Sequence, residues 1–257
     1  MAHPHSPNSI DDFTPAITVQ SFRSAGVRYR PKGRKSGRIH HLLSTLEYQY
    51  FLCLDFSPLV TRIREQYPLP LLQTQDCARR LQLRHPWNQD AHEAAIMTTD
   101  FLVDLTMPNG ATKLIARSTK YTLDAAQGRA REKLEIERLY WNDCNVDWGL
   151  ITERSIPPTV VANARWLDIN GRDIDSPPAP AEMLPHISAT LRESLSRGSS
   201  LGSACSVTDR LLKLPKGSCL GCVRFLINNG EWCVDISQPI RVEAPLIFLD
   251  NDAKGGA

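Results

Sequence analysis

The sequence contains no long uninterrupted run of apolar residues. No stretch of its 257 residues approaches the length of about 18 apolar residues that a membrane-spanning helix needs. Its first residues, MAHPHSPNSIDDF, also lack the basic start and the apolar segment of a secretory signal peptide. The sequence therefore predicts a cytoplasmic protein that makes no membrane contact.

A large excess of one charge is also missing. Thirty lysines and arginines stand against 28 aspartates and glutamates, a formal net charge of +2, so the total charge identifies no partner. The hydrophobic content of 42% is enough for an ordinary packed core. The seven cysteines are odd in number and scattered through a chain that needs no covalent staples, which indicates reduced thiols.

One segment departs from this balance. Between Ser21 and His41 the chain carries seven cations and no acidic residue: Arg23, Arg28, Arg30, Lys32, Arg34, Lys35 and Arg38. Such a cluster can neutralise several phosphates of a nucleic acid, so these seven residues are candidate DNA contacts. The alternative is a solvated N-terminal segment with no ligand.

The spacing of prolines divides the chain. Periodic patterns run up to Arg154, and a stretch rich in Ser and Asp then follows, punctuated by Pro157, Pro158, Pro177, Pro178 and Pro180. We expect a basic N-terminal arm at residues 1–38, a first domain at 39–155, and a linker with a second domain at 156–257.

The first domain reads as a mixed α/β domain. Apolar positions 43, 46, 50 and 54 have the spacing of one helix face, and Val60–Pro68 reads as a strand. A polar loop is expected from Gln73 to Asp90, and then a hairpin over 98–122 with its turn at Pro108-Asn109-Gly110. A charged helix over 129–146 and a short strand over 147–153 complete the order.

The second domain begins with helical patterns, over residues 181–195 and 206–214. Apolar residues alternate on both sides of Asn229-Gly230 between Val223 and Ile236, which predicts another hairpin. Helices followed by a hairpin have the element order of a winged-helix domain, a type that binds nucleic acid or protein. This comparison rests on element order alone.

The hairpin at 98–122 carries the chemistry. Folding it about Gly110 places Asp100 across from Lys120, within a register error of about one residue. Glu47 falls on the core-facing side of the preceding helix. Two alternatives remain: Asp100 and Lys120 can form a simple cross-strand ion pair, and Ser44 to Glu47 fits the capping box of a helix start.

A helix-borne glutamate, a strand aspartate and a lysine on the next strand resemble the PD-(D/E)xK nuclease site. Phosphodiester hydrolysis needs a hard cation held by oxygen ligands, here Mg²⁺ with Mn²⁺ as a substitute. The resemblance assigns Glu47 and Asp100 to the metal and Lys120 to the developing charge. Ser118 stands where the pattern has Asp or Glu, which makes it a poor or indirect metal ligand.

Several motifs together resemble the TnsA family, the endonuclease subunits of heteromeric transposases. They are STLEYQYFLCLDF, VTRIREQYPL, TTDFLVDL, ARSTKY and IERLYWNDCNVDWGLITE, in this order over roughly residues 25–160. The catalytic residues of the family correspond to Glu47, Asp100 and Lys120, and the glutamate of its IE-x-x-YW motif to Glu137. Glu137 lies next to Lys133 and Arg138, so it can either reach the site or make ion pairs on the helix surface, and the supporting or structural role is the favoured one.

This resemblance implies a restriction-endonuclease-like domain at 39–155 and a smaller helical domain that contacts DNA or partners. It also implies cleavage of the 5′, non-transferred strands of double-stranded transposon ends. The expected partners are a DDE transposase of the TnsB type and an AAA+ ATPase of the TnsC type. The alternatives are a stand-alone restriction or repair nuclease and a catalytically silent DNA-binding scaffold.

A second motif has metal-ligand spacing. Cys219 and Cys222 form a C-x-x-C pair, with Cys205 and Cys233 nearby. Structural zinc normally takes two such pairs, and the sequence has one, so buried free thiols are the favoured interpretation.

Overall fold

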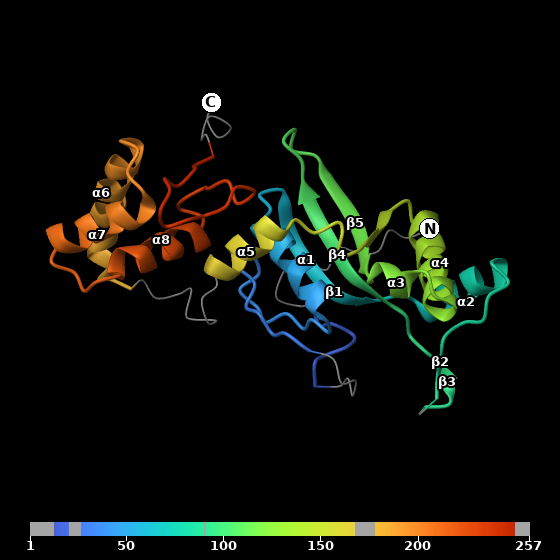
Figure 1. Cartoon of the computed structure of the whole chain (residues 1–257). Coiled ribbons are helices and arrows are strands. Elements are labelled where there is room, and N and C mark those ends of the chain that lie inside the picture. The colour runs from blue at the N-terminus through green and yellow to red at the C-terminus, as the bar shows by residue number, and fades with distance from the viewer. Residues whose placement is uncertain (1–12, 21–26, 90, 168–177, 250–257) are drawn as a thin grey trace. The chain divides into compact units, whose positions relative to one another are not determined.

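The computed structural model describes residues 13–20, 27–89, 91–167 and 178–249. The chain folds as two compact units, Met1–Ile156 and Pro157–Ala257, each with its own interior (Figure 1). The helices in the described ranges are too short or too polar to cross a membrane.

The first unit is built on a four-stranded sheet. Its strands are β1 (Val60–Pro68), β4 (Thr98–Thr106), β5 (Thr112–Thr119) and β6 (Asp147–Ile151), in the order β1-β4-β5-β6. β1, β4 and β5 are antiparallel neighbours, and β6 runs parallel to β5. The predicted strand at Val60–Pro68, the hairpin and the strand after the charged helix are confirmed.

The hairpin register differs from the expected one. Phe101 pairs with Arg117 and Thr106 with Thr112, so Lys120 lies two positions beyond the residue opposite Asp100. The turn is closed by a hydrogen bond from the Met107 amide to the Ala111 carbonyl, which centres it on Asn109 rather than Gly110. The predicted pairing of Asp100 with Lys120 is therefore wrong by two residues, because the turn is centred one residue earlier than expected.

Helices cover both faces of this sheet. α1 (Thr45–Phe56) lies on one face, where Tyr50 contacts Phe101 of β4 edge-on. The neighbouring residue Leu102 faces the other side, in a core shared with α2 (Leu71–Arg80) and α4 (Gly128–Asp143). A short α3 (Thr122–Ala125) joins β5 to α4 (Figure 1). The order of helix, three strands, helix and strand is confirmed, with additional short elements.

The prediction of a polar loop at Gln73–Asp90 is wrong in its first part, because residues 73–80 belong to α2. Thr74, Cys77 and Ala78 are buried at helical spacing, and the many polar residues between them hid this face. After α2 the chain forms a small ribbon of β2 (Trp87–Asn88) and β3 (Glu93–Ala94) that projects from the domain (Figure 1). Residue 90 is outside the described ranges.

The second unit is helical. It contains α5 (Pro158–Leu167), a 3₁₀ turn η3 (Ala181–Met183), α6 (Leu184–Ser196), α7 (Leu201–Leu211) and α8 (Ser218–Asn228). The two predicted helical stretches correspond to η3 with α6 and to α7, although α7 begins five residues earlier and ends at Leu211.

The predicted hairpin at Val223–Ile236 is wrong. Its first half is α8, because the buried residues of this segment also have the i, i+3, i+4 spacing of a helix: Cys219, Cys222, Val223, Leu226 and Ile227. Gly230, with φ of +75°, lies just beyond the end of the helix instead of in a two-residue hairpin turn.

The winged-helix expectation loses its predicted wing with that hairpin. Among the described residues after α8, one isolated antiparallel pairing joins Val234 with Phe248. α8 is covered by α5, since the Arg224 guanidinium stacks on Trp166 and the Asn228 side chain donates to the Leu167 carbonyl.

Candidate active site

Glu47 caps α1 and faces the interior at the same time. Ser44 is the N-cap residue, and its hydroxyl accepts a hydrogen bond from the Glu47 amide at 3.1 Å. In return the Glu47 carboxylate accepts from the Ser44 hydroxyl at 3.0 Å and from the Leu43 amide at 2.9 Å. The capping box and the buried acid are thus one arrangement, and the two interpretations of Glu47 do not exclude each other.

Gln66 joins the two acids of the site. Its side-chain amide Nε2 donates to Glu47 Oε2 at 3.2 Å and to Asp100 Oδ1 at 3.3 Å. Its Oε1 accepts from the Thr98 hydroxyl at 3.2 Å, which fixes the orientation of the amide. Sequence reasoning missed this residue, because nothing in the strand pattern VTRIREQYP sets Gln66 apart.

The backbone of Gln66 is unusual for a strand. Its φ is +48°, a value that residues other than glycine rarely adopt and that costs free energy. The pairing of β1 with β4 keeps one register from Arg62 to Pro68, and the four consecutive residues Ile63 to Gln66 are all buried because helices cover both faces of the sheet. Such strain at the point where two carboxylates meet is typical of a functional site.

Asp100 is held from the neighbouring strand. Its Oδ2 accepts from the Thr119 amide at 2.7 Å and from the Thr119 hydroxyl at 2.9 Å. Burial raises the pKa of Asp100, although these hydrogen bonds oppose the shift. Burial and the charge of Asp100 raise the pKa of Glu47 to about 8. The two acids therefore disfavour each other's ionised forms, and a bound cation would relieve this repulsion.

Lys120 follows the end of β5 and is exposed. Its amide donates to the Ile151 carbonyl at 3.0 Å, which anchors its backbone to β6. Within the described ranges its ammonium forms no ion pair with Asp100, so the expected direct contact is absent. Its positive charge still lowers the pKa of Asp100, as the smallest of the five influences on that group.

Ser118 and Glu137 contact each other instead of the two acids. The Ser118 hydroxyl donates to Glu137 Oε1 at 2.5 Å, and the same oxygen accepts from the Thr99 hydroxyl at 2.7 Å and from Trp148 Nε1 at 3.1 Å. Burial raises the pKa of Glu137 to about 7. Glu137 thus ties α4 to β4, β5 and β6 behind the site.

Comparison with known proteins identifies the family of this chain. Residues 57–153 match the family model described as TnsA-like endonuclease N terminal. The chain is also 33% identical to the transposon Tn7 transposition protein TnsA of Escherichia coli over 220 residues, 85% of this chain and 78% of that protein. This chain belongs to the TnsA family. The matched model starts at residue 57, so it includes Gln66, Asp100 and Lys120 but not Glu47.

The donor set of this TnsA-family site fits a hard cation. Among the described residues, no three His, Cys, Asp or Glu side chains cluster closely enough to enclose a metal ion. Mg²⁺ does not need such a cage, because it is usually held by one or two carboxylates and keeps several waters. Glu47 and Asp100 supply two carboxylates that repel each other, which is the chemistry that favours such an ion.

The basic segment of this TnsA-family chain is folded onto the endonuclease domain. Bridges pair Tyr29 with Leu42 and Lys32 with Ile39, and Arg23 lies outside the described ranges. The amides of Arg34 and Lys35 donate to the buried carboxylate of Asp55 at 2.9 and 3.3 Å. Other candidates have mixed surroundings: Arg28 donates to the Val19 carbonyl, whereas the side chains of Arg30 and Lys32 are exposed.

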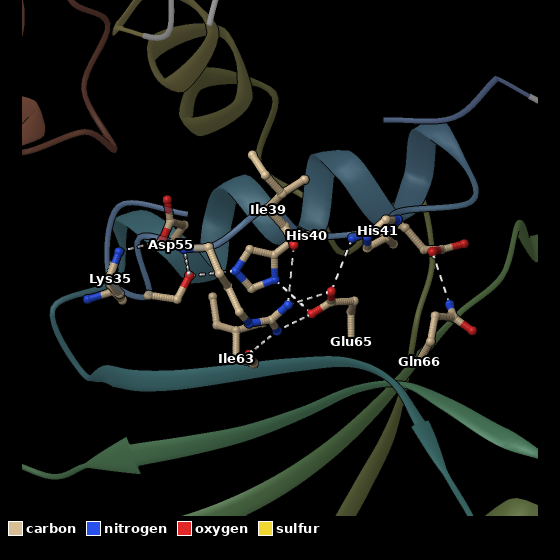
Figure 2. A network of polar contacts seen from close by, with 11 residues as sticks. Lys35, Ile39, His40, His41, Asp55, Ile63, Glu65 and Gln66 are labelled. Atoms are coloured by element: carbon tan, nitrogen blue, oxygen red, sulfur yellow. Dashed lines mark hydrogen bonds and ion pairs between the residues drawn. The ribbon is translucent and has the colours of Figure 1, made fainter. Parts of the chain in front are cut away.

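Arg38 belongs to a buried network. It forms an ion pair with Glu65 of β1, whose carboxylate also contacts His40 Nδ1 at 2.7 Å and accepts from the His41 amide at 3.1 Å (Figure 2). Burial alone would raise the pKa of Glu65, but His40 and Arg38 outweigh it and lower the pKa to about 2. Arg38 therefore serves the domain interior, and we remove it from the candidate DNA contacts.

Proposed function

We propose that this protein is the metal-dependent endonuclease subunit of a transposase and cleaves the 5′, non-transferred strands at transposon ends. One observation carries the proposal: a single amide, Gln66 Nε2, lies between two carboxylates whose pKa values are both raised. Acids in this state indicate a site for a cation and a phosphate rather than a stabilising ion pair.

Glu47 and Asp100 are the residues that would hold Mg²⁺, with Mn²⁺ as a substitute. The ion supplies charge neutralisation at the scissile phosphate and lowers the pKa of water. Thr119 fixes Asp100, and the α1 cap fixes Glu47, so both acids are oriented before substrate binds. Ser118 is not among the proposed metal ligands, because its hydroxyl donates to Glu137.

Lys120 stabilises the negative charge that grows on the phosphate. It is exposed and has no ion-pair partner among the described residues, so its ammonium is available to a ligand. Its backbone is fixed between β5 and β6 by the bond to Ile151. A lysine placed beside acids that bind a cation provides the electrostatic help that phosphodiester hydrolysis needs.

The substrate and partners follow from the family. The matched relative is named as a protein of Tn7 transposition, and we propose double-stranded transposon-end DNA as the substrate here. A DDE transposase of the TnsB type would cut the 3′ strands, and an AAA+ ATPase of the TnsC type would regulate both. The retained pair of buried acids speaks against a silent scaffold, because burying unpaired charge is costly.

The test is cleavage of a labelled transposon-end duplex in the presence of the cognate transposase, the ATPase and Mg²⁺. We expect wild-type protein to cut the 5′ strands and Asp100→Ala to leave only 3′ cuts. Asp124→Ala, an exposed acid of α3 four residues from Lys120, is the matched control and should cut like the wild type. Identical products from wild type and Asp100→Ala would contradict the nuclease assignment.

A stand-alone nuclease is distinguished in the same experiment. If the protein cuts the duplex with Mg²⁺ alone and the partners change neither rate nor position, it works outside a transposition complex. If cutting depends on both partners, the subunit assignment stands.

A further inference from the structure

One face of α4 leads away from the active site. Arg129, Lys133 and Glu137 are spaced four residues apart, so their side chains form one row along the helix, with neighbouring Cβ atoms about 5–6 Å apart. Glu137 marks the inner end of the row, because it contacts Thr99 and Ser118. Arg129 marks the outer end, in the first turn of α4.

The outer part of the row, Arg129 and Lys133, is a cluster of like charges. Lys133 is exposed and, like Lys120, has no ion-pair partner among the described residues. Although the residue as a whole is exposed, partial burial of its ammonium lowers the pKa of Lys133, and the positive charges of Arg129 and Lys120 lower it further. Arg129 has one partner, Glu132, in an exposed pair three residues along the same helix. Exposed pairs of this kind contribute little and do not compensate the row.

The start of α4 adds to the positive potential. The helix has 16 residues, its first turn contains no acidic residue, and Gln127 at the N-cap makes no side-chain capping bond. Amide groups at a helix start favour anions. The charge of Arg129 also reaches His85, where it lowers the pKa after the larger effect of burial. The positive region therefore extends from Lys120 to the segment that follows α2. α2 itself packs beside α4 (Figure 1).

We propose that Lys133 and Arg129 form a phosphate-binding track that holds the DNA backbone on the side of the active site where α4 begins. The proposal rests on the proposed nuclease function, because it takes the substrate to be DNA. The row begins at Glu137, which lies close enough to the two acids for the charge of Asp100 to raise its pKa, and its outer two residues are cations. A polyanion whose charges repeat regularly suits such a row better than an isolated acidic group.

A double variant, Arg129→Gln with Lys133→Gln, tests the track. Its matched control is Lys113→Gln with Arg138→Gln. Arg138 lies on the opposite side of α4, is 54% exposed against 43% for Arg129, and has the same type of i, i+3 pair, with Glu135. Lys113 is an exposed lysine of β5, at the far end of the strand from Thr119. Both double variants remove two positive charges.

The readout is the salt dependence of binding to a fluorescently labelled linear duplex, measured by anisotropy with the full chain in EDTA. Two lost phosphate contacts reduce the slope of log affinity against log salt by about 1.8. Between 50 and 200 mM salt, wild type should therefore lose about 12-fold more affinity than the track variant. The control variant should keep the wild-type slope.

Each result decides one question. Equal slopes for the track and control variants would overturn the track, and so would a wild type that binds no duplex at low salt. Unchanged duplex binding by the track variant, with 5′ cleavage lost in the assembled reaction, would assign the row to a protein partner and also overturn the proposal. The track variant can show the expected reduced slope while wild type, with its partners, shows no Mg²⁺-dependent cleavage. That result would refute the nuclease function and leave the track standing.

Discussion

Replacing Glu47 with glutamine isolates the electrostatic cost of the active site in the metal-free protein. The pKa of Glu47 rises from an ordinary 4.5 to about 8 on folding. The folded protein therefore binds this proton more tightly than the unfolded chain, and the free energy of unfolding falls as the pH rises from 4.5 to 8. At pH 7 the loss is about 3 kcal/mol, and above pH 8 it reaches about 5 kcal/mol.

Glutamine removes the charge and keeps the contacts. Its carbonyl can accept from the Leu43 amide and from Gln66, and its amide can donate to the Ser44 hydroxyl. Glutamine also fits the third position of a capping box. We expect Glu47→Gln to be more stable than wild type by about 3 kcal/mol at pH 7, with the difference vanishing near pH 4.5.

The assay is urea unfolding in EDTA at several pH values between 4.5 and 8, with the slopes compared to confirm that the same surface unfolds. Glu132→Gln, a partly exposed glutamate of α4, is the control and should stay within about 0.5 kcal/mol of wild type. Mg²⁺ should raise the midpoint of wild type and not that of Glu47→Gln. A variant no more stable at pH 8, or equally stabilised at pH 4.5, would refute the reasoning.

Three further substitutions test the groups around the acids. Glu65→Gln should lower the free energy of unfolding by about 3 kcal/mol at pH 7, because the pKa of Glu65 is about 2. This contribution is present above about pH 4.5 and is lost as the pH falls towards 2, so acid unfolding curves of wild type and variant should converge there. Gln66→Leu should raise the Mg²⁺ concentration needed for half-maximal cleavage by about 10- to 100-fold, the usual effect of losing a group that orients metal ligands. An unchanged Mg²⁺ titration would contradict this. Glu137→Gln keeps an acceptor for three donors and should cleave nearly as wild type, whereas Glu137→Ala strands Thr99, Ser118 and Trp148 and should lose several kcal/mol of stability, at about 1–3 kcal/mol for each unpaired donor. A folded but inactive Glu137→Gln would show that the charge itself is needed.

The strands of the first unit could be predicted because their signals are local. Alternation in Val60–Pro68 and the Pro-Asn-Gly turn of the hairpin depend on neighbouring residues alone. The register could not be fixed in the same way. Whether the turn centres on Asn109 or Gly110 depends on which backbone hydrogen bond closes it. The turn residues do not specify the hydrogen bond from the Met107 amide to the Ala111 carbonyl.

α8 shows why the same pattern misled in the second unit. Val223 and Ile227 fit alternation with Phe225 between them, but they also fit a helix face with Cys219 and Leu226. Five buried residues at helical spacing outweigh a three-residue alternation once α5 and α7 are there to pack against. That competition is decided by the tertiary structure, which overrides local propensity.

Gln66 marks the limit of prediction at the site itself, and the network around Glu65 explains how its strained backbone persists. A positive φ at a residue with a side chain costs of order 1–3 kcal/mol, and the adjacent Glu65 contributes about 3 kcal/mol through His40 and Arg38. The Gln66 carbonyl is also bonded by the Ala16 amide. The N-terminal segment thus helps to hold β1 in a conformation that lets Gln66 reach both acids. On this reasoning Arg38 supports the strand that carries Gln66 from inside the domain, whereas Arg30 and Lys32 of the same basic run are exposed.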